Sequence, residues 1–239
     1  MILFWRLLLS HLLADFMLQL DAVNRLKRKN VWGMTLHCLT HYVVSVALTW
    51  SYLPQTWVKL GSVPVSGWWA LSIILVLHFA VDQLRVMGLR RLHFRDGTLS
   101  FLADQVLHVY VLFMISPVVI LAENGLLAEK WTGLAAIFVL VTNVSTVLIY
   151  FIEKEFFGKD FPGFDEKYFL IFERLVLWLF FLVEGRWWVP FALAWIAQIL
   201  YVRKKRMIDL SKLNVVLSIV ITCALGLWAR FVYYGCLWQ

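Results

Sequence analysis

Residues 67–88 read GWWALSIILVLHFAVDQLRVMG. This stretch is long enough to cross a bilayer, since a transmembrane helix needs roughly 20 mainly apolar residues. Its apolar part is interrupted by His78 and Asp82, which are spaced i, i+4. That spacing puts both side chains on one face of a helix, one turn apart. The stretch therefore predicts a membrane helix that presents a His/Asp pair to its neighbours.

The whole chain has the same apolar character. Of its 239 residues, 62% are hydrophobic and 15% are charged, whereas soluble domains carry about 45–50% apolar and about 25% charged residues. A soluble globular protein is therefore excluded. The 12 glycines, 5 prolines and 3 cysteines also exclude disorder, a collagen-like fibre and a disulfide scaffold. We predict an all-α, polytopic integral membrane protein whose partner is the lipid bilayer and not nucleic acid.

Eight segments have the length of membrane spans. They are 1–22, 31–53, 67–88, 99–122, 132–152, 168–184, 188–202 and 213–237. The sixth and seventh are short and separated only by residues 185–187, so they form either a tight helical hairpin or a re-entrant pair. Of the 22 Lys and Arg residues, sixteen fall in alternate loops, including Lys27 and Arg85, which places those loops in the cytoplasm and both termini outside.

Ionisable residues inside a span are costly and are by default functional candidates. The first four spans carry eight of them as four i, i+4 pairs, the spacing by which one helix offers two ligands to a metal. The pairs are His11 and Asp15, His37 and His41, His78 and Asp82, and Asp104 and His108. One such pair alone would equally suit a helix-packing hydrogen bond, and an Asp can also orient a ligating His.

The four pairs repeat at a constant offset of 67 residues, His11 matching His78 and His37 matching Asp104. We interpret residues 1–67 and 68–134 as a tandem repeat of one helical hairpin, with a pseudo-two-fold axis along the membrane normal. Residues 1–131 then form a four-helix metal-site bundle. Residues 132–239 form C-terminal transmembrane helices that support it or admit substrate.

Five imidazoles and three carboxylates suit a divalent transition metal, Zn first and Mn or Fe as alternatives. Two ions, bridged by an Asp and a water, would use most of the eight ligands. The expected function is a metal-dependent hydrolase in the cytoplasmic half of the membrane, acting on a phosphate ester or lipid headgroup. Six further polar residues are candidates for orienting ligands or substrate: Gln19, Asn24, Gln83, Gln105, Glu173 and Arg174. The cysteines Cys38, Cys223 and Cys236 lack metal-type spacing and are interpreted as small apolar residues.

The run His11-Leu-Leu-Ala-Asp15-Phe-Met-Leu-Gln19, with Asn24, the paired histidines His37 and His41, and Phe101-Leu-Ala-Asp104-Gln105-x-x-His108, resembles a bacterial and phage family labelled domain of unknown function 3307. The resemblance implies a multi-pass protein of the bacterial inner membrane, and brings no established activity. The helices are also similar in style to those of membrane-bound metal-dependent hydrolases, which is an argument by analogy.

Two other functions are consistent with these residues. A divalent-metal or proton transporter also uses His and Asp pairs on membrane helices. A membrane cytochrome would use two of the histidines as axial haem ligands. The paired aspartates make this the least favoured of the three functions.

Overall fold

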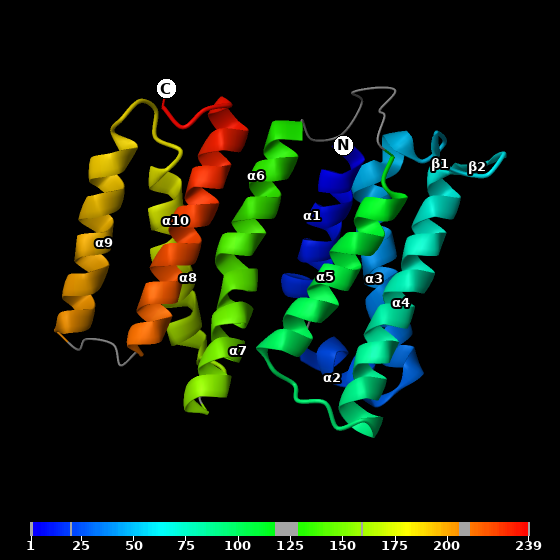
Figure 1. Ribbon diagram of the computed structural model, residues 1–239, viewed down its shortest axis with the longest axis horizontal. Coiled ribbons are helices and arrows are strands. Elements are labelled where there is room, and N and C mark those ends of the chain that lie inside the picture. The colour runs from blue at the N-terminus through cyan, green and yellow to red at the C-terminus, as the bar shows by residue number, and fades with distance from the viewer. Residues whose placement is uncertain (1, 20, 118–128, 159, 206–210, 239) are drawn as a thin grey trace. The chain divides into compact units, whose positions relative to one another are not determined.

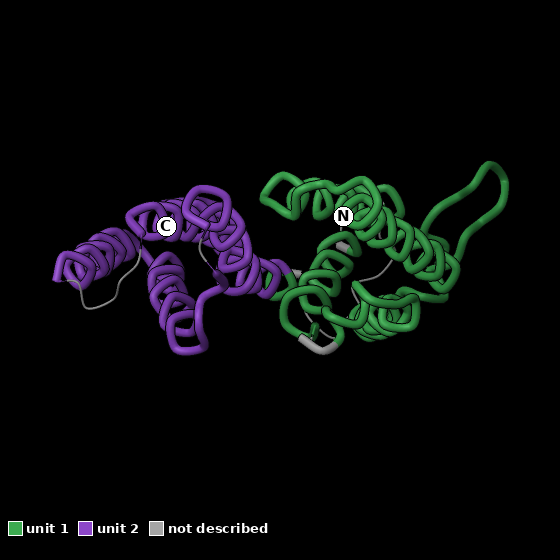
Figure 2. Tube along the Cα trace, turned by 90° about the horizontal axis from the view of Figure 1, so that it is seen from below, with its two compact units in different colours: residues 1–132 green, residues 133–239 purple. Residues whose placement is uncertain are grey.

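The computed structural model describes residues 2–19, 21–117, 129–158, 160–205 and 211–238. Contacts along the chain divide it into two compact units, residues 1–132 and residues 133–239 (Figure 2). Each unit is described by itself below.

The first unit is built on four apolar helices, to which a short helix and a hairpin are added (Figure 1). Its elements are α1 (Ile2–Phe16), α2 (Asp21–Lys29), α3 (Val31–Thr49), β1 (Thr56–Leu60), β2 (Val63–Ser66), α4 (Gly67–Arg91) and α5 (Thr98–Ile115). Helix α1 packs against α3 and α5, and α4 packs against α3 and α5. The four long helices therefore enclose a common interior.

Helix α1 is shorter than the span 1–22 expected from hydropathy. It ends at Phe16, where the main-chain N–H groups of Met17 and Leu18 both donate to the carbonyl of Leu13. The next helix, α2, has the sequence DAVNRLKRK and ends in three basic residues. The segment expected to be a cytoplasmic loop is therefore partly helical. It packs closely on α3, because a Cβ added to Gly33 would lie only 2.3 Å from the carbonyl carbon of Leu26.

A two-stranded antiparallel hairpin departs from the all-helical prediction. Strands β1 and β2 pair with Leu60 opposite Val63, so the turn consists of Gly61 and Ser62. Gly61 has a φ of +66°, a conformation that glycine adopts without steric cost. The strands contain the β-branched residues that favour extended backbone. Apolar periodicity does not detect so short a strand pair beside two long spans.

The second unit is entirely helical in the residues described. It contains most of α6 (Glu129–Val139), a π-helical segment (Leu140–Val144), α7 (Ser145–Phe157), α8 (Phe164–Phe180), α9 (Trp188–Lys204) and α10 (Lys212–Tyr234). Helices α8 and α9 are joined by a short turn (Figure 1), a connection that both the helical hairpin and the re-entrant pair would have. The buried Arg230 of α10 stabilises this turn by donating to the carbonyls of Phe181, Val183 and Gly185.

Five helical segments in the described part of the chain are long and apolar enough to cross a membrane. They are Val31–Tyr52, Gly67–Arg91, Thr98–Ile115, Lys130–Phe157 and Lys212–Tyr234. Three further expected spans correspond to α1, α8 and α9, which have 15, 17 and 17 residues. The expected end of the fourth span beyond residue 117 lies outside the described residues. The chain is therefore a mostly helical, multi-pass membrane protein.

Candidate metal centre

The four long helices of the first unit each supply one of the i, i+4 pairs. His11 and Asp15 lie on α1, His37 and His41 on α3, His78 and Asp82 on α4, and Asp104 and His108 on α5. Seven of the eight side chains are buried, and the side chain of Asp15 is 11% exposed. Helical spacing puts each pair on one face, and the packing of the four helices turns those faces toward one interior.

One histidine from each helix contributes to a layer of imidazole rings. The ring centroids of His41 and His78 are 3.9 Å apart, and those of His78 and His108 are 4.2 Å apart. His11 closes the layer at 5.0 Å from His108 and 5.3 Å from His41. Side chains almost 100 residues apart in sequence therefore meet in one buried layer.

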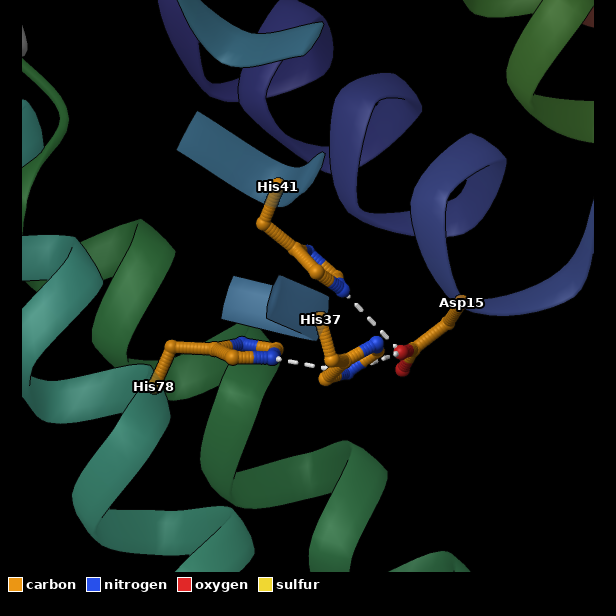
Figure 3. A group of neighbouring side chains, drawn as sticks. All are labelled: Asp15, His37, His41 and His78. Carbon is orange, nitrogen blue, oxygen red and sulfur yellow. Dashed lines mark hydrogen bonds and ion pairs between the residues drawn. The ribbon is translucent and has the colours of Figure 1, made fainter. Parts of the chain in front are cut away.

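Two histidines of this layer, His41 and His78, form a compact group of ligand atoms with Asp15 and His37. Asp15 Oδ1 lies 3.1 Å from His41 Nε2 and 3.2 Å from His37 Nε2, and His37 Nε2 lies 3.4 Å from His78 Nε2 (Figure 3). One ligand atom from each of the four residues lies within 4.8 Å of the other three. A tetrahedral ion bound at about 2.0–2.1 Å holds its ligand atoms about 3.3 Å apart. Three of the six separations between these atoms, 3.1, 3.2 and 3.4 Å, are close to the edge length of such a tetrahedron.

A second group consists of Asp82, Asp104 and His108, whose ligand atoms also lie within 4.8 Å of one another. His108 Nδ1 lies 2.8 Å from the main-chain carbonyl oxygen of Asp104 and donates to it. That hydrogen bond leaves the lone pair on Nε2, as is usual for a histidine that binds metal. Within the described residues, His108 Nε2 and Asp104 Oδ1 are buried and have no hydrogen-bond partner. Buried polar atoms are normally satisfied, so this pair is suited to a ligand.

Cys38 contributes to a third group. Its sulfur and the ligand atoms of His78 and Asp82 lie within 4.8 Å of one another. The cysteine is buried and free, which agrees with the expected burial, but it is not surrounded only by apolar groups. Cysteine spacing along the chain does not reveal this position because the other members of the group come from α4. The informative signal is that Cys38 directly follows His37.

Gln19 fixes the tautomer of His37. In the amide orientation that satisfies both ends, Oε1 accepts from His37 Nδ1 at 3.2 Å, and Nε2 donates to the main-chain oxygen of Asp15. His37 Nε2 faces the carboxylate oxygens Asp15 Oδ1 and Asp82 Oδ2, each at 3.2 Å, and Lys27 Nζ lies 3.4 Å away. A metal-binding histidine usually has a hydrogen-bond partner on its other ring nitrogen, so the contact with Gln19 suits His37 Nε2 as a ligand atom.

Gln105 connects the two groups. Its Oε1 accepts from His11 Nε2 at 3.3 Å, and its Nε2 donates to Asp104 Oδ2 at 3.2 Å and to Asp15 Oδ2 at 3.5 Å. An amide that holds carboxylates of two groups in place positions both of them. Gln19 and Gln105 are thus the two polar candidates that contact the eight residues.

The other polar candidates lie elsewhere. Asn24 and Gln83 are half-buried, and neither has a hydrogen bond to the eight residues within the described ranges. The described partners of Glu173 and Arg174 belong to the second unit: Glu173 pairs with Arg203, and Arg174 donates to the carbonyl of Thr142.

Two cations whose positions in the sequence indicate membrane topology, Lys27 and Arg85, contact the cluster. Lys27 Nζ lies 3.5 Å from Asp82 Oδ2, and Arg85 Nη1 donates to Asp104 Oδ2 at 3.1 Å. Arg85 also pairs with Asp96 at 3.2 Å. The sequence contains one signal for Arg85, since it lies three residues after Asp82 and so near the same helix face. Lys27 gives no such signal because α2 brings it in from a separate helix.

A small cavity adjoins the imidazole layer. Its volume is about 20 Å³, and its lining combines the polar side chains of Ser10, His11, His41, Ser45 and His78 with the apolar side chains of Leu71, Ile74, Leu75 and Leu112. A cavity of this size with polar groups in its lining accommodates about one water molecule. Solvent can therefore be held directly beside three of the candidate ligands.

Comparison with known proteins supports the sequence resemblance. The family model described as "Protein of unknown function (DUF3307)" matches residues 3–152, a range that contains all four i, i+4 pairs. No curated protein and no solved structure matches the chain. Since the match covers more than half of the 239 residues, the chain belongs to the DUF3307 family.

Proposed function

We propose that the protein is a membrane-embedded, metal-dependent hydrolase with a His/Asp site that binds two divalent transition-metal ions, zinc first. The observation that carries the proposal is the group of Asp15, His37, His41 and His78, whose separations of 3.1, 3.2 and 3.4 Å fit tetrahedral coordination. A five-imidazole donor set favours zinc, manganese or iron over calcium or magnesium.

The second ion would bind to Asp82, Asp104 and His108. Support comes from the two buried atoms of this group that lack partners, His108 Nε2 and Asp104 Oδ1. Three protein ligands with one open position are typical of catalytic rather than structural zinc sites. Asp82 is within ligand distance of His78 as well, which makes it the residue suited to bridge the two ions.

Hydrolysis is the chemistry that such a pair supplies, since bound divalent ions lower the pKa of water and stabilise negative charge on a reacting group. Three carboxylates against two divalent ions leave a positive site, and Lys27 and Arg85 at its edge add to that charge. An anionic substrate is therefore favoured. We propose a phosphate ester or a lipid headgroup, which reaches the site from the cytoplasmic half of the bilayer.

The proposed architecture has eight spans, with α1, α8 and α9 crossing the bacterial inner membrane besides the five long segments, and both termini outside. The tandem repeat is supported by helix order. Neighbouring pairs are α1–α3, α3–α4, α4–α5 and α5–α1, so α1 lies diagonally opposite α4, and α3 opposite α5. A two-fold axis through the bundle would superpose α1 on α4 and α3 on α5. These are the helices whose matching His and Asp residues lie 67 positions apart.

Elemental analysis of gently purified protein tests the proposal. We expect two equivalents of transition metal per chain, and one equivalent in Asp104→Asn, because that substitution weakens only the second group. His93→Asn is the matched control, since His93 is exposed and has a φ of 55° that asparagine tolerates. Protein without transition metal would refute the metal site, and a Soret absorption band would identify haem instead.

A transporter is the second candidate, favoured by the water-sized cavity that continues from the imidazole layer to Ser10 and Ser45. Asp82→Ala separates the two functions when metal retention and metal flux are both measured in liposomes. Flux in the wild type that is lost in the variant would support transport. Tightly bound metal without flux, together with release of phosphate from a phosphate ester, would support the hydrolase.

A further inference from the structure

A polar pocket lies within the second unit, among α8, α9 and α10. Its polar lining comprises Glu173, Arg174, Arg203, Asn214, Ser218 and Thr222. None of these residues falls in the range 3–152 matched by the family model. The pocket is therefore a feature separate from the His/Asp cluster, and it is built from charged residues that a membrane helix bundle rarely buries.

Arg174 is held by the irregular part of the α6–α7 helix. Its Nη2 donates to the carbonyl of Thr142 at 3.1 Å and to the hydroxyl of Thr146. Thr142 belongs to the π-helical segment, and such segments occur frequently at functional sites. The side chain is 2% exposed, yet its Nε has no partner among the described residues.

Arg203 lies in the last turn of α9 and pairs with Glu173 through Nη2. Its side chain is 10% exposed. The Nε and Nη1 atoms are buried and have no hydrogen-bond partner within the described ranges. One edge of this guanidinium group is thus occupied by an ion pair, and its remaining donors are free.

Asn214 adds an acceptor to the same pocket. Its Nδ2 donates to Glu153 Oε2 at 2.6 Å, which fixes the amide. Its Oδ1 is buried without a partner in the part of the chain that the structure describes. Three donor nitrogens and one acceptor oxygen without partners therefore belong to residues that line one pocket.

The lining residues include two arginines and one glutamate, and a second carboxylate, that of Glu153, is bound to Asn214 from outside the lining. Free guanidinium donors are suited to an oxyanion, and arginine binds phosphate with paired hydrogen bonds. The enclosed space of the pocket is about 10 Å³, which is room for about one water. One water accepts two hydrogen bonds, fewer than the three unpartnered donor atoms supply.

We propose that this pocket binds a phosphate group that carries a hydrogen-bond donor, as in a phosphatidylglycerol headgroup or a soluble phosphate monoester. Because the free Nε and Nη1 atoms are buried, the pocket must widen before the phosphate oxygens can accept from Arg174 and Arg203. The donor, a hydroxyl of the headgroup or of the phosphate itself, reaches Asn214 Oδ1.

Binding is tested on the full chain in detergent with three probes: phosphatidylglycerol, phosphatidylcholine and inorganic phosphate. Native mass spectrometry measures bound lipid, and thermal unfolding measures stabilisation by each probe. We expect phosphatidylglycerol to bind and raise Tm, and phosphatidylcholine, whose headgroup lacks a donor, to do so at least about tenfold more weakly. Binding of inorganic phosphate without binding of phosphatidylglycerol would also support the phosphate site, and would identify its ligand as a soluble phosphate and not a lipid.

Arg203→Lys preserves the charge that pairs with Glu173 but removes the free Nε and Nη1 donors, so we expect at least about tenfold weaker binding. The control is Arg186→Lys, since Arg186 is an exposed arginine of the same unit. Ser218→Leu fills the pocket without changing any charge and covers the case in which Arg203→Lys fails to fold. The proposal is overturned if no probe binds, or if both variants bind like the wild type.

Discussion

At the scale of single residues, the properties of the cluster depend on which nitrogen of each histidine carries the proton. Gln19 Oε1 accepts a hydrogen bond from His37 Nδ1, and the main-chain carbonyl of Asp104 accepts one from His108 Nδ1. Nε2 of each ring is then the nitrogen available to a metal ion. Metal-binding histidines generally have a hydrogen-bond partner on the nitrogen that does not bind the ion, and Gln19 and the Asp104 carbonyl have that position here.

Lys27 occupies the edge of the site and competes with a metal ion for the same atoms, since Nζ lies 3.4 Å from His37 Nε2 and 3.5 Å from Asp82 Oδ2. We expect Lys27→Gln to bind zinc about tenfold more tightly, a change of about 1.4 kcal/mol from the removed like charge. Lys29→Gln, an exposed position on the same helix, is the control. Competition with a chelator measures both affinities, and equal or weaker binding by Lys27→Gln contradicts the expected competition.

Asp96, in the segment between α4 and α5, provides a pH-dependent contribution to stability. Partial burial would raise the pKa of Asp96, but Arg28 at 3.0 Å and Arg85 at 3.2 Å together hold this pKa below its usual value. A lowered carboxyl pKa stabilises the folded state above the ordinary value of about 4, and the contribution disappears as pH falls through that region.

We therefore expect Asp96→Asn to lower the free energy of unfolding at pH 7 by about 0.5–1 kcal/mol. The difference from wild type should shrink as the pH is lowered toward 3 to 4. Thermal unfolding across this pH range measures it, with Asp160→Asn at an exposed position as the control. A difference that is constant with pH would mean that the ion pairs do not contribute.

At the scale of elements, the contact between α2 and α3 brings Lys27 to the cluster. Gly33 permits this contact, since a Cβ there would lie 2.3 and 2.5 Å from the carbonyl carbon and oxygen of Leu26. Backbone atoms cannot yield as a flexible side chain does. Helix α2 must therefore move if residue 33 gains a side chain.

Gly33→Ala tests that contact. We expect a loss of about 1–3 kcal/mol in the free energy of unfolding, typical of overpacking, and a change in zinc affinity because Lys27 moves with α2. Gly163→Ala is the matched control, because a Cβ at Gly163 meets nothing within 4 Å. Thermal unfolding and chelator competition give the two quantities. A stable Gly33→Ala protein with unchanged zinc binding would show that α2 does not position the site.

At the scale of the whole molecule, the chain contains two units with different polar interiors. The first unit gathers histidines and aspartates, and the second gathers arginines, glutamates and main-chain carbonyls. Both are buried among apolar helices, where ionisable side chains need partners. The proposed metal site and the proposed phosphate site thus belong to separate helix groups.

The proposed eight-span topology predicts which loops face the outside. In a cysteine-free background, Lys59→Cys in the β1–β2 hairpin should react with an impermeant maleimide on intact cells. Arg91→Cys at the end of α4 should react only after the membrane is opened. Both positions are exposed, so access depends on the membrane and not on burial. Labelling of position 91 on intact cells would invert the proposed orientation.

Sequence alone determined the membrane class, the positions of most helices and the choice of the eight residues in the four i, i+4 pairs as site candidates. Hydropathy and the i, i+4 spacing are local properties of the chain. Only the tertiary structure decided that Lys27, Arg85 and Cys38 join the cluster, that Gln19 and Gln105 contact it, and that α1 ends at Phe16. It also decided that Arg174 and Arg203 share a pocket. Such contacts join helices distant in sequence, and they depend on how the helices pack.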